Sequence, residues 1–349
     1  MKRRMPDNKL QDALLHTLAT FEHFDPETEA LFLGSSHTVY GFAPKNCRRL
    51  RAWNAGFNSG DLKMAYYTYQ ALRDKWPKQP GQCVVISEDF FMNSTRCEFS
   101  SEFYQPLLLS QFSAFRFDNS FRLAPHRRLI AQRIAAVRAS GIPEAILAER
   151  GFIPNLTPNL ELESAEAAIA RARRHCKMAY YTPSQLPWLE QLKAAVIADE
   201  RTLIFLRYPA SERYRKTVEA TGIPVWEPAE SLREGCPLLN YFDAPVPPEH
   251  WIDDDHFTDA GARAFTQTLE PVLLNLMGKN VPLCAEKERT GAVPKSDAEE
   301  TCDAQRPSCV CAPVSNAPGH GDSARTQPAE TANASGSSAT ADAQTTSGI

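Results

Sequence analysis

Two adjacent serines follow a short apolar run near the start of the chain. The run covers residues 29–33 (EALFL), and Gly34, Ser35, Ser36 and His37 come directly after it. A hydroxyl at a strand-to-helix turn lies at the carboxyl edge of a parallel sheet, where the free N–H groups of the next helix stabilise an oxyanion. The segment suits a serine nucleophile, and it equally suits a serine that caps a helix. Because the Gly-x-Ser-x-Gly pattern is absent, an ordinary α/β-hydrolase is disfavoured.

An acidic loop late in the chain contains the residue types that such a nucleophile requires. Residues 251–257 are WIDDDHF, so Asp253 and His256 have Asp-x-x-His spacing. A serine nucleophile needs an imidazole base, and a carboxylate fixes the tautomer of that base. On one loop, this spacing allows the carboxylate to meet Nδ1 while Nε2 faces the serine. A solvated acidic loop, or a divalent-cation site in a metal-dependent phosphohydrolase, remains an alternative for residues 253–255.

Two further features could contact a substrate. Residues 54–60 (NAGFNSG) contain glycines that permit tight turns and leave backbone N–H groups open, as an oxyanion site needs. A plain turn between a strand and a helix has the same composition. Arg207 lies near the end of the strongest strand-like stretch, where it can bind an anionic substrate group, or serve as a cap or in a surface ion pair.

The hydropathy pattern predicts the frame that positions these segments. Strand-like stretches alternate with helical ones, which indicates a three-layer α/β/α fold with a central parallel sheet of about five strands. The predicted strands are 29–33, 51–53, 83–87, 202–208 and 224–226, and the predicted helices are 61–75, 184–199, 211–220 and 258–277. In such a sheet the loops at the carboxyl ends of the strands converge on one edge.

The chain divides into three parts. An N-terminal helical segment covers 1–27, and a sheet-containing domain covers 28–280. Within this domain, residues 93–181 form a predicted helical insertion after the third strand. Its helical stretches are 106–112, 125–140, 144–149 and 165–178. This insertion would serve as a lid or a substrate surface. The remainder, 281–349, has no Leu, Phe, Trp, Tyr or Met after residue 284 and is rich in Ala, Ser and Thr, which predicts a disordered tail.

The order of the motifs, with a serine early and Asp-x-x-His late, resembles the SGNH (GDSL-type) hydrolase superfamily over residues 28–278. Gly34-Ser35-Ser36 matches that family's Gly-Asp-Ser, which nominates Ser36 as the nucleophile. Asp253 and His256 match its last block and would complete a Ser-His-Asp triad.

The same resemblance implies the surroundings of the triad. The backbone N–H groups of Ser36 and of Ser59 or Gly60 would hold the oxyanion. Apart from the resemblance, the positions of Asn54 and Arg207 at or near strand ends make them the predicted substrate contacts. The family's third block, Gly-x-Asn-Asp, is absent after the third strand. Asn93 or Asn58 would therefore have to supply the missing side-chain donor.

The branch with Gly-Ser-Ser is linked to modification of cell-surface polysaccharides, including acyl transfer. The resemblance thus implies a serine esterase or O-acyltransferase that acts on an ester, such as an acylated carbohydrate, with no cofactor and no metal. A non-catalytic protein of the same fold that binds a glycan or a protein partner is the alternative, because the third block is missing.

Composition narrows the partners and the compartment. Lys and Arg number 38 against 42 Asp and Glu, for a net charge of −4, which argues against a nucleic-acid partner.

The absence of about 20 consecutive apolar residues predicts no transmembrane helix. Polar residues after the basic N-terminus predict no signal peptide, so we expect a cytoplasmic protein, with envelope association left open. The cysteines before residue 280 form no CxxC pair, as in a reduced chain, and Cys309 and Cys311 could bind a soft metal.

Overall fold

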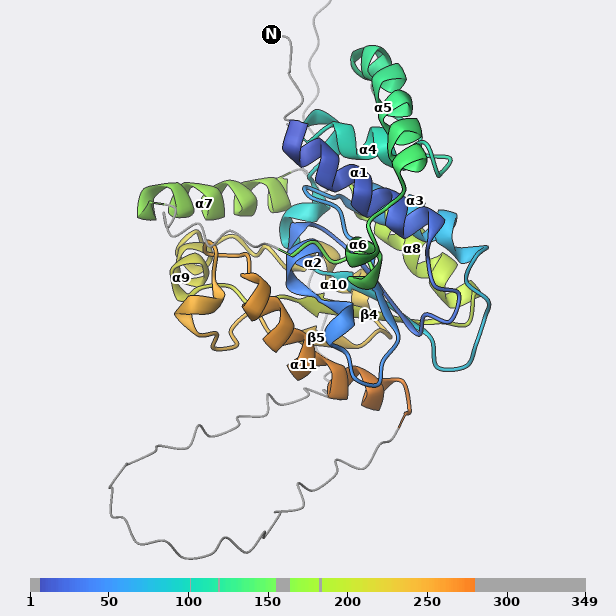
Figure 1. Cartoon of the computed structure of the whole chain (residues 1–349). Coiled ribbons are helices and arrows are strands. Elements are labelled where there is room, and N and C mark those ends of the chain that lie inside the picture. Colours follow the sequence, from blue (N-terminus) through green and yellow to red (C-terminus); the bar gives the residue numbers. More distant parts are fainter. Residues whose placement is uncertain (1–6, 101, 119, 155–163, 182–183, 280–349) are drawn as a thin grey trace, which may run out of the picture. The chain divides into compact units, whose positions relative to one another are not determined.

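The computed structural model describes residues 7–279, apart from 101, 119, 155–163 and 182–183 (Figure 1). The predicted disorder of 281–349 and the pair Cys309 and Cys311 lie outside these residues. Within the described part of the chain, no helix combines the length and the apolar character that a membrane span requires.

Five parallel strands form one central sheet in the order β2-β1-β3-β4-β5. Each is a short and largely apolar run, as expected for strands that are covered on both faces. The strands are β1 (Ala30–Leu33), β2 (Ala52–Asn54), β3 (Cys83–Ser87), β4 (Thr202–Arg207) and β5 (Leu238–Asn240). The predicted three-layer α/β/α fold with about five parallel strands is therefore confirmed.

The position of the fifth strand was predicted wrongly. Residues 224–226 form a local turn in which the Val225 N–H donates to the Ile223 carbonyl, and Pro224 has no N–H to offer a strand ladder. The segment 238–240 takes the edge position instead, with Leu239 registered opposite Leu206 of β4. Its three residues carry too little periodic pattern to be recognised from sequence alone.

Alternate strand residues point into two different apolar layers. Val84 and Ile86 of β3 belong to the layer formed with α3 (Leu62–Arg73), α8 (Leu186–Ala198) and α9 (Glu212–Ala220). Val85, between them, belongs to the opposite layer with α11 (Asp259–Leu276), which also packs against α2 (Ser36–Gly41). The sheet is thereby covered by helices on both faces, which holds its carboxyl edge in place.

Several helices lie between β3 and α8, where the sequence predicted an insertion. α4 (Tyr104–Leu109) and α5 (Ser120–Ser140) share a third apolar cluster with the N-terminal α1 (Asp7–Glu22). α7 (Ala165–Tyr181) packs instead against α9 (Figure 1). It also packs against the 3₁₀ helix η2 that follows β3. The shorter elements are η1 (Pro44–Asn46), η2 (Phe90–Asn93), η3 (Cys97–Phe99), α6 (Glu144–Ala148), η4 (Glu227–Ala229), α10 (Glu230–Arg233) and η5 (Pro248–His250).

The sheet topology indicates where a ligand would bind. β1 has β2 on one side and β3 on the other, so the connections that leave β1 and β3 diverge. Crevices of doubly wound sheets form outside the carboxyl ends of the strands at such a switch point. Ser35 and Ser36 follow β1. Ser87 is the last residue of β3, and Glu88 and Asp89 follow it, so both groups lie at this switch point.

Candidate active site

Ser36 is placed by a tight turn at the end of β1. Gly34 has φ +151°, and a Cβ at this position would collide with the side chains of Ser87 and Thr38. Ser35 has an extended conformation and caps α2, since its Oγ accepts a hydrogen bond of 3.2 Å from the His37 N–H. Ser36 is therefore the first residue of the helix.

The hydroxyl of Ser36 contacts the imidazole of the late acidic loop. Ser36 Oγ lies 2.8 Å from His256 Nε2, and His256 Nδ1 lies 2.9 and 3.0 Å from the two carboxylate oxygens of Asp253. The Asp253 carboxylate also accepts the backbone N–H groups of Asp255 and His256, at 3.1 and 2.9 Å, which holds the loop in shape. The structure thus brings together the three residues that the sequence nominated as a triad, in the required order.

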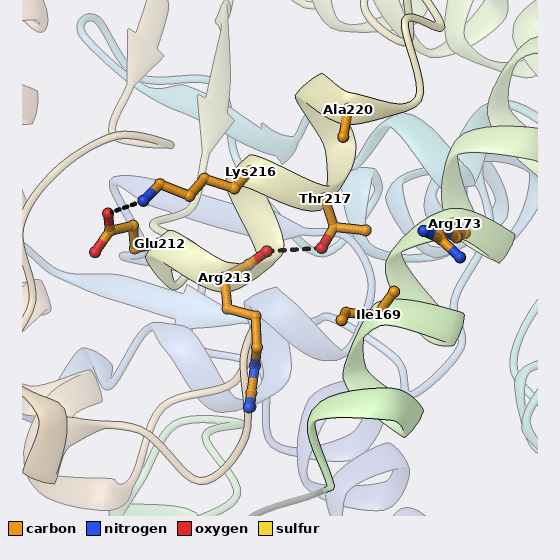
Figure 2. A pocket seen from close by; sticks show the side chains of 7 residues that line it. All are labelled: Ile169, Arg173, Glu212, Arg213, Lys216, Thr217 and Ala220. Carbon is orange, nitrogen blue, oxygen red and sulfur yellow. Dashed lines mark hydrogen bonds and ion pairs between the residues drawn. The ribbon is translucent and has the colours of Figure 1, made fainter.

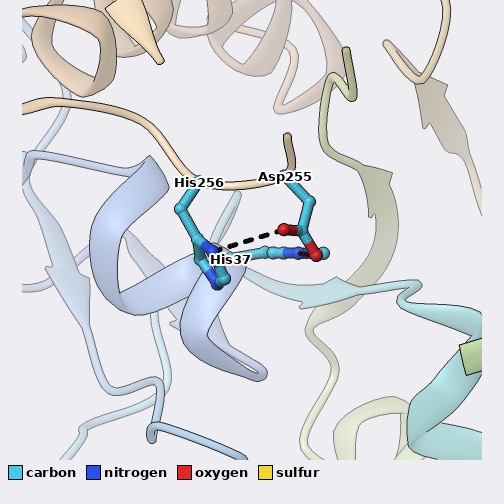
Figure 3. A group of neighbouring side chains, drawn as sticks. All are labelled: His37, Asp255 and His256. Carbon is cyan, nitrogen blue, oxygen red and sulfur yellow. Dashed lines mark hydrogen bonds and ion pairs between the residues drawn. The ribbon is translucent and has the colours of Figure 1, made fainter. Parts of the chain in front are cut away.

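A second imidazole, which the sequence analysis did not nominate, lies beside the first (Figure 3). His37 Nδ1 is 2.6 Å from Asp89 Oδ1, and its Nε2 is 3.3 Å from Asp255 Oδ2. Burial alone would lower the pKa of His37, but the charges of Asp89 and Asp255 raise this pKa to about 10. His37 is therefore an imidazolium at neutral pH, with both nitrogens occupied.

The loop after β3 contributes a carboxylate to the site. Asp89 Oδ2 accepts hydrogen bonds from Ser35 Oγ at 2.5 Å and from Ser87 Oγ at 2.9 Å. Burial would raise the pKa of Asp89, but the adjacent imidazolium and the two hydroxyls hold this pKa below its usual value. A polar Ser-Glu-Asp directly after an apolar strand was the sequence signal that could have identified Asp89.

Arg171 of α7 reaches the same loop from the segment between β3 and β4. Its Nη1 is 3.2 Å from Asp253 Oδ2, and its Nη2 is 2.7 Å from Asp255 Oδ1. Asp255 is deeply buried, yet its cationic neighbours hold its pKa well below the usual value. No local pattern distinguishes Arg171 from Arg173 and Arg174 on the same helix, so the sequence offered no signal for it.

The third aspartate of the acidic run points elsewhere. Asp254 accepts hydrogen bonds from Ser211 Oγ at 2.8 Å and from Arg213 Nε at 2.7 Å, which ties the loop to the start of α9. Arg213 also lines a groove of about 450 Å³ between α7 and α9, together with Arg173 and Lys216 (Figure 2). Ser36 does not line this groove, so the groove is separate from the candidate site.

The donor set does not favour the divalent cation considered for the acidic loop. His37, Asp255 and His256 offer ligand atoms within 4.8 Å of one another (Figure 3). Asp255 is already paired with the guanidinium of Arg171, however, and the protonated His37 adds a second positive charge. A metal ion at this point would have to replace the proton on His37 and share Asp255 with Arg171.

The two residues predicted to contact the substrate, Asn54 and Arg207, are both hydrogen-bonded within the protein. Asn54 is fully buried, its Nδ2 donates to the carbonyls of Thr38 and Phe42 at 2.7 Å each, and its Oδ1 accepts the Gly56 N–H. Both of its donors and one acceptor site are therefore used to hold the end of β2 against α2 and the following loop.

Arg207 is likewise committed within the protein. Its Nε donates to Glu88 Oε2 at 2.8 Å, and its guanidinium lies 3.8 Å from the ring centroid of Trp226. Only 8 % of the residue is exposed. The structure therefore contains a buried ion pair at Arg207, where the sequence had left a surface pair as the alternative.

The predicted oxyanion donors differ in their availability. The Gly60 N–H donates to the Phe57 carbonyl at 2.8 Å, so this donor is already used. Ser59 has φ 52°, and its N–H has no acceptor among the described residues. Ser36 is the first residue of α2, so its N–H has no intrahelical acceptor. Both N–H groups are therefore available to an oxyanion.

The two asparagines considered as side-chain donors lie in different places. Asn93 is buried in η2, where its carbonyl accepts the Gln185 N–H at 2.9 Å. Asn58 Nδ2 donates to the Tyr40 hydroxyl at 2.9 Å, and the Tyr40 ring meets His256 edge-on at 5.9 Å between centroids. Asn58 is thus connected to the candidate site through one side chain.

Comparison with known proteins adds little to this geometry. No family model matches the sequence, and no curated protein matches it. A solved chain from Streptococcus pneumonia, provisionally described as a platelet activating factor, is similar with a TM-score of 0.36 and 11 % identity. That similarity covers 77 % of this chain and 94 % of the other. The site therefore stands on this chain's own geometry.

Proposed function

We propose that the protein is a serine hydrolase or O-acyltransferase that acts on an ester, with an acylated carbohydrate as the substrate class. Ser36 is the nucleophile, His256 is the general base and Asp253 orients His256. The observation that carries this proposal is the chain of contacts from the Ser36 hydroxyl through both His256 nitrogens to Asp253, at the switch point of the sheet.

In the proposed mechanism each proton moves in a defined direction. With the Nδ1–H donated to Asp253, Nε2 is free to take the Ser36 proton while Oγ attacks the ester carbonyl. The imidazolium then protonates the leaving alcohol, which leaves an acyl group on Ser36. His256 then removes a proton from water or from a sugar hydroxyl, whose oxygen attacks the acyl carbonyl. The imidazolium returns this proton to the departing Ser36 oxygen, which regenerates both Ser36 and neutral His256.

The negative charge on the carbonyl oxygen needs donors. We assign the backbone N–H groups of Ser36 and Ser59 to this role, each contributing about 3 kcal/mol of transition-state stabilisation. The engaged Gly60 N–H and the absent third-block asparagine favour the alternative, a non-catalytic protein that binds a glycan or a protein partner.

A fluorophosphonate probe tests the nucleophile, because it reacts with an activated serine without requiring the natural substrate. We expect the wild-type protein to be labelled on Ser36 and the Ser36→Ala variant to remain unlabelled, as measured by mass spectrometry of the intact chain. Ser35→Ala should keep the label, since the Ser35 hydroxyl contacts Asp89 and not His256. Label that persists in Ser36→Ala would refute this nucleophile, and a folded wild type that takes no label would favour the binding protein.

A further inference from the structure

We infer that Arg171 is a positioning residue that offsets the negative charge of the two carboxylates beside His256, so that the imidazole stays available to take the Ser36 proton. The inference rests on the proposed function, because it concerns the base of that reaction. Its basis is the contact of one guanidinium with both carboxylates that surround the imidazole.

His256 has two carboxylates against the same nitrogen. Its Nδ1 is 2.9 Å from Asp253 Oδ1 and 3.4 Å from Asp255 Oδ1. Each negative charge at this distance favours the protonated imidazole. A histidine that is already protonated has no lone pair for the Ser36 proton, so two uncompensated carboxylates would prevent base catalysis at neutral pH.

Arg171 opposes this excess of negative charge. It places one nitrogen on Asp253 and the other on Asp255, and its side chain is only 17 % exposed. A guanidinium is charged at every pH relevant to the reaction. Because α7 also packs against η2 and α9, this charge is delivered from a helix that is held on two sides.

The charges of the whole network give a simple sum. Asp89, Asp253 and Asp255 contribute three negative charges, and His37 and Arg171 contribute two positive charges, which leaves one negative charge when His256 is neutral. One negative charge is what a triad with a single carboxylate has. The five charged groups near His256 therefore have the same net charge as the single carboxylate of a simple triad.

The other titratable groups that face the network are either uncharged at neutral pH or paired with an opposite charge. His175 of α7 and the Tyr214 hydroxyl of α9 lie 2.8 Å apart; burial lowers the pKa of His175 to about 3 and raises that of Tyr214. Burial also raises the pKa of Tyr40, whose ring meets His256. Asp254 is paired with Arg213.

The pH dependence of Ser36 labelling by the fluorophosphonate probe tests the inference. In Arg171→Gln, the acidic limb should move upward by about one pH unit or more, since removing a nearby charge produces shifts of this size. Labelling at pH 7 then falls, while the plateau at high pH changes little. Asp255→Asn should move the limb downward, and the double variant should return it towards the wild-type position.

Controls separate charge balance from simple loss of structure. Arg173→Gln, at an exposed position of the same helix, should leave the limb unchanged, and Arg171→Lys should keep it near the wild-type pH because the charge remains. A uniform loss of labelling at every pH in Arg171→Gln, or an equal shift in Arg171→Lys, would overturn the inference. If wild-type Ser36 is not labelled at any pH, the proposed function fails before this question arises.

Discussion

Replacing His256 with glutamine is expected to slow acylation of Ser36 by a factor on the order of 10⁴ to 10⁶. Glutamine cannot take the proton from the Ser36 hydroxyl, which lies 2.8 Å from His256 Nε2. Asp253→Asn should slow the reaction by about 10⁴, because an amide group that donates to Nδ1 selects the wrong tautomer of the imidazole. The rates of fluorophosphonate labelling and of ester turnover, measured at pH 8, report both effects.

A histidine outside the site provides the matched control. His23→Gln changes an exposed histidine just after α1 and should label at the wild-type rate. Circular dichroism checks that each variant keeps its helices. If His256→Gln reacted within tenfold of the wild type, His256 would not be the base, and the contact with Ser36 would have only a structural role.

Replacing His37 with glutamine is expected to lower the free energy of unfolding at pH 7 by about 3–5 kcal/mol. His37 is the cation between Asp89 and Asp255, both of which are buried. Without it, two carboxylates remain in the interior with less compensation. Urea denaturation, with the midpoint and slope fitted separately, measures the loss.

A double-mutant cycle shows whether the loss comes from the ion pair. In His37→Gln combined with Asp89→Asn, one of the two carboxylates is also neutralised, so the double variant should lose less stability than the sum of the single variants. Additive losses would mean that His37 stabilises the protein by packing against Phe91 and Tyr208 and not by its charge.

The same imidazolium predicts a pH dependence of stability. Since the pKa of His37 is about 10 in the folded protein and about 6.5 in an unfolded chain, its contribution is complete below pH 6.5. Between these values, stability should fall by about 1.4 kcal/mol for each pH unit, because only the folded state binds the proton. Buried thiols also make the protein less stable as the pH rises through this range. The difference in the free energy of unfolding between the wild type and His37→Gln therefore isolates the contribution of His37. Parallel curves for the two proteins would contradict it.

Local patterns of the sequence were sufficient to predict part of this protein. The short apolar runs of β1, β3 and β4 and the amphipathic helices between them predicted the layered fold, because strand and helix periodicity depends on near neighbours. Asp253 and His256 are three residues apart, so one loop determines their contact. The end of β1 and the start of α11 identified the loops that meet at the sheet edge.

Only the tertiary structure decided the composition of the charged network. The contacts of His37 with Asp89 and Asp255 join residues 52 and 218 positions apart, and Arg171 reaches Asp253 across 82 positions. The hydrogen bonds of Asn54 and Arg207 likewise depend on residues that are not their neighbours in the sequence. An isolated sequence shows which residues can carry charge or donate a hydrogen bond. The partner of each group depends on how helices pack onto the sheet, which the chain determines only as a whole.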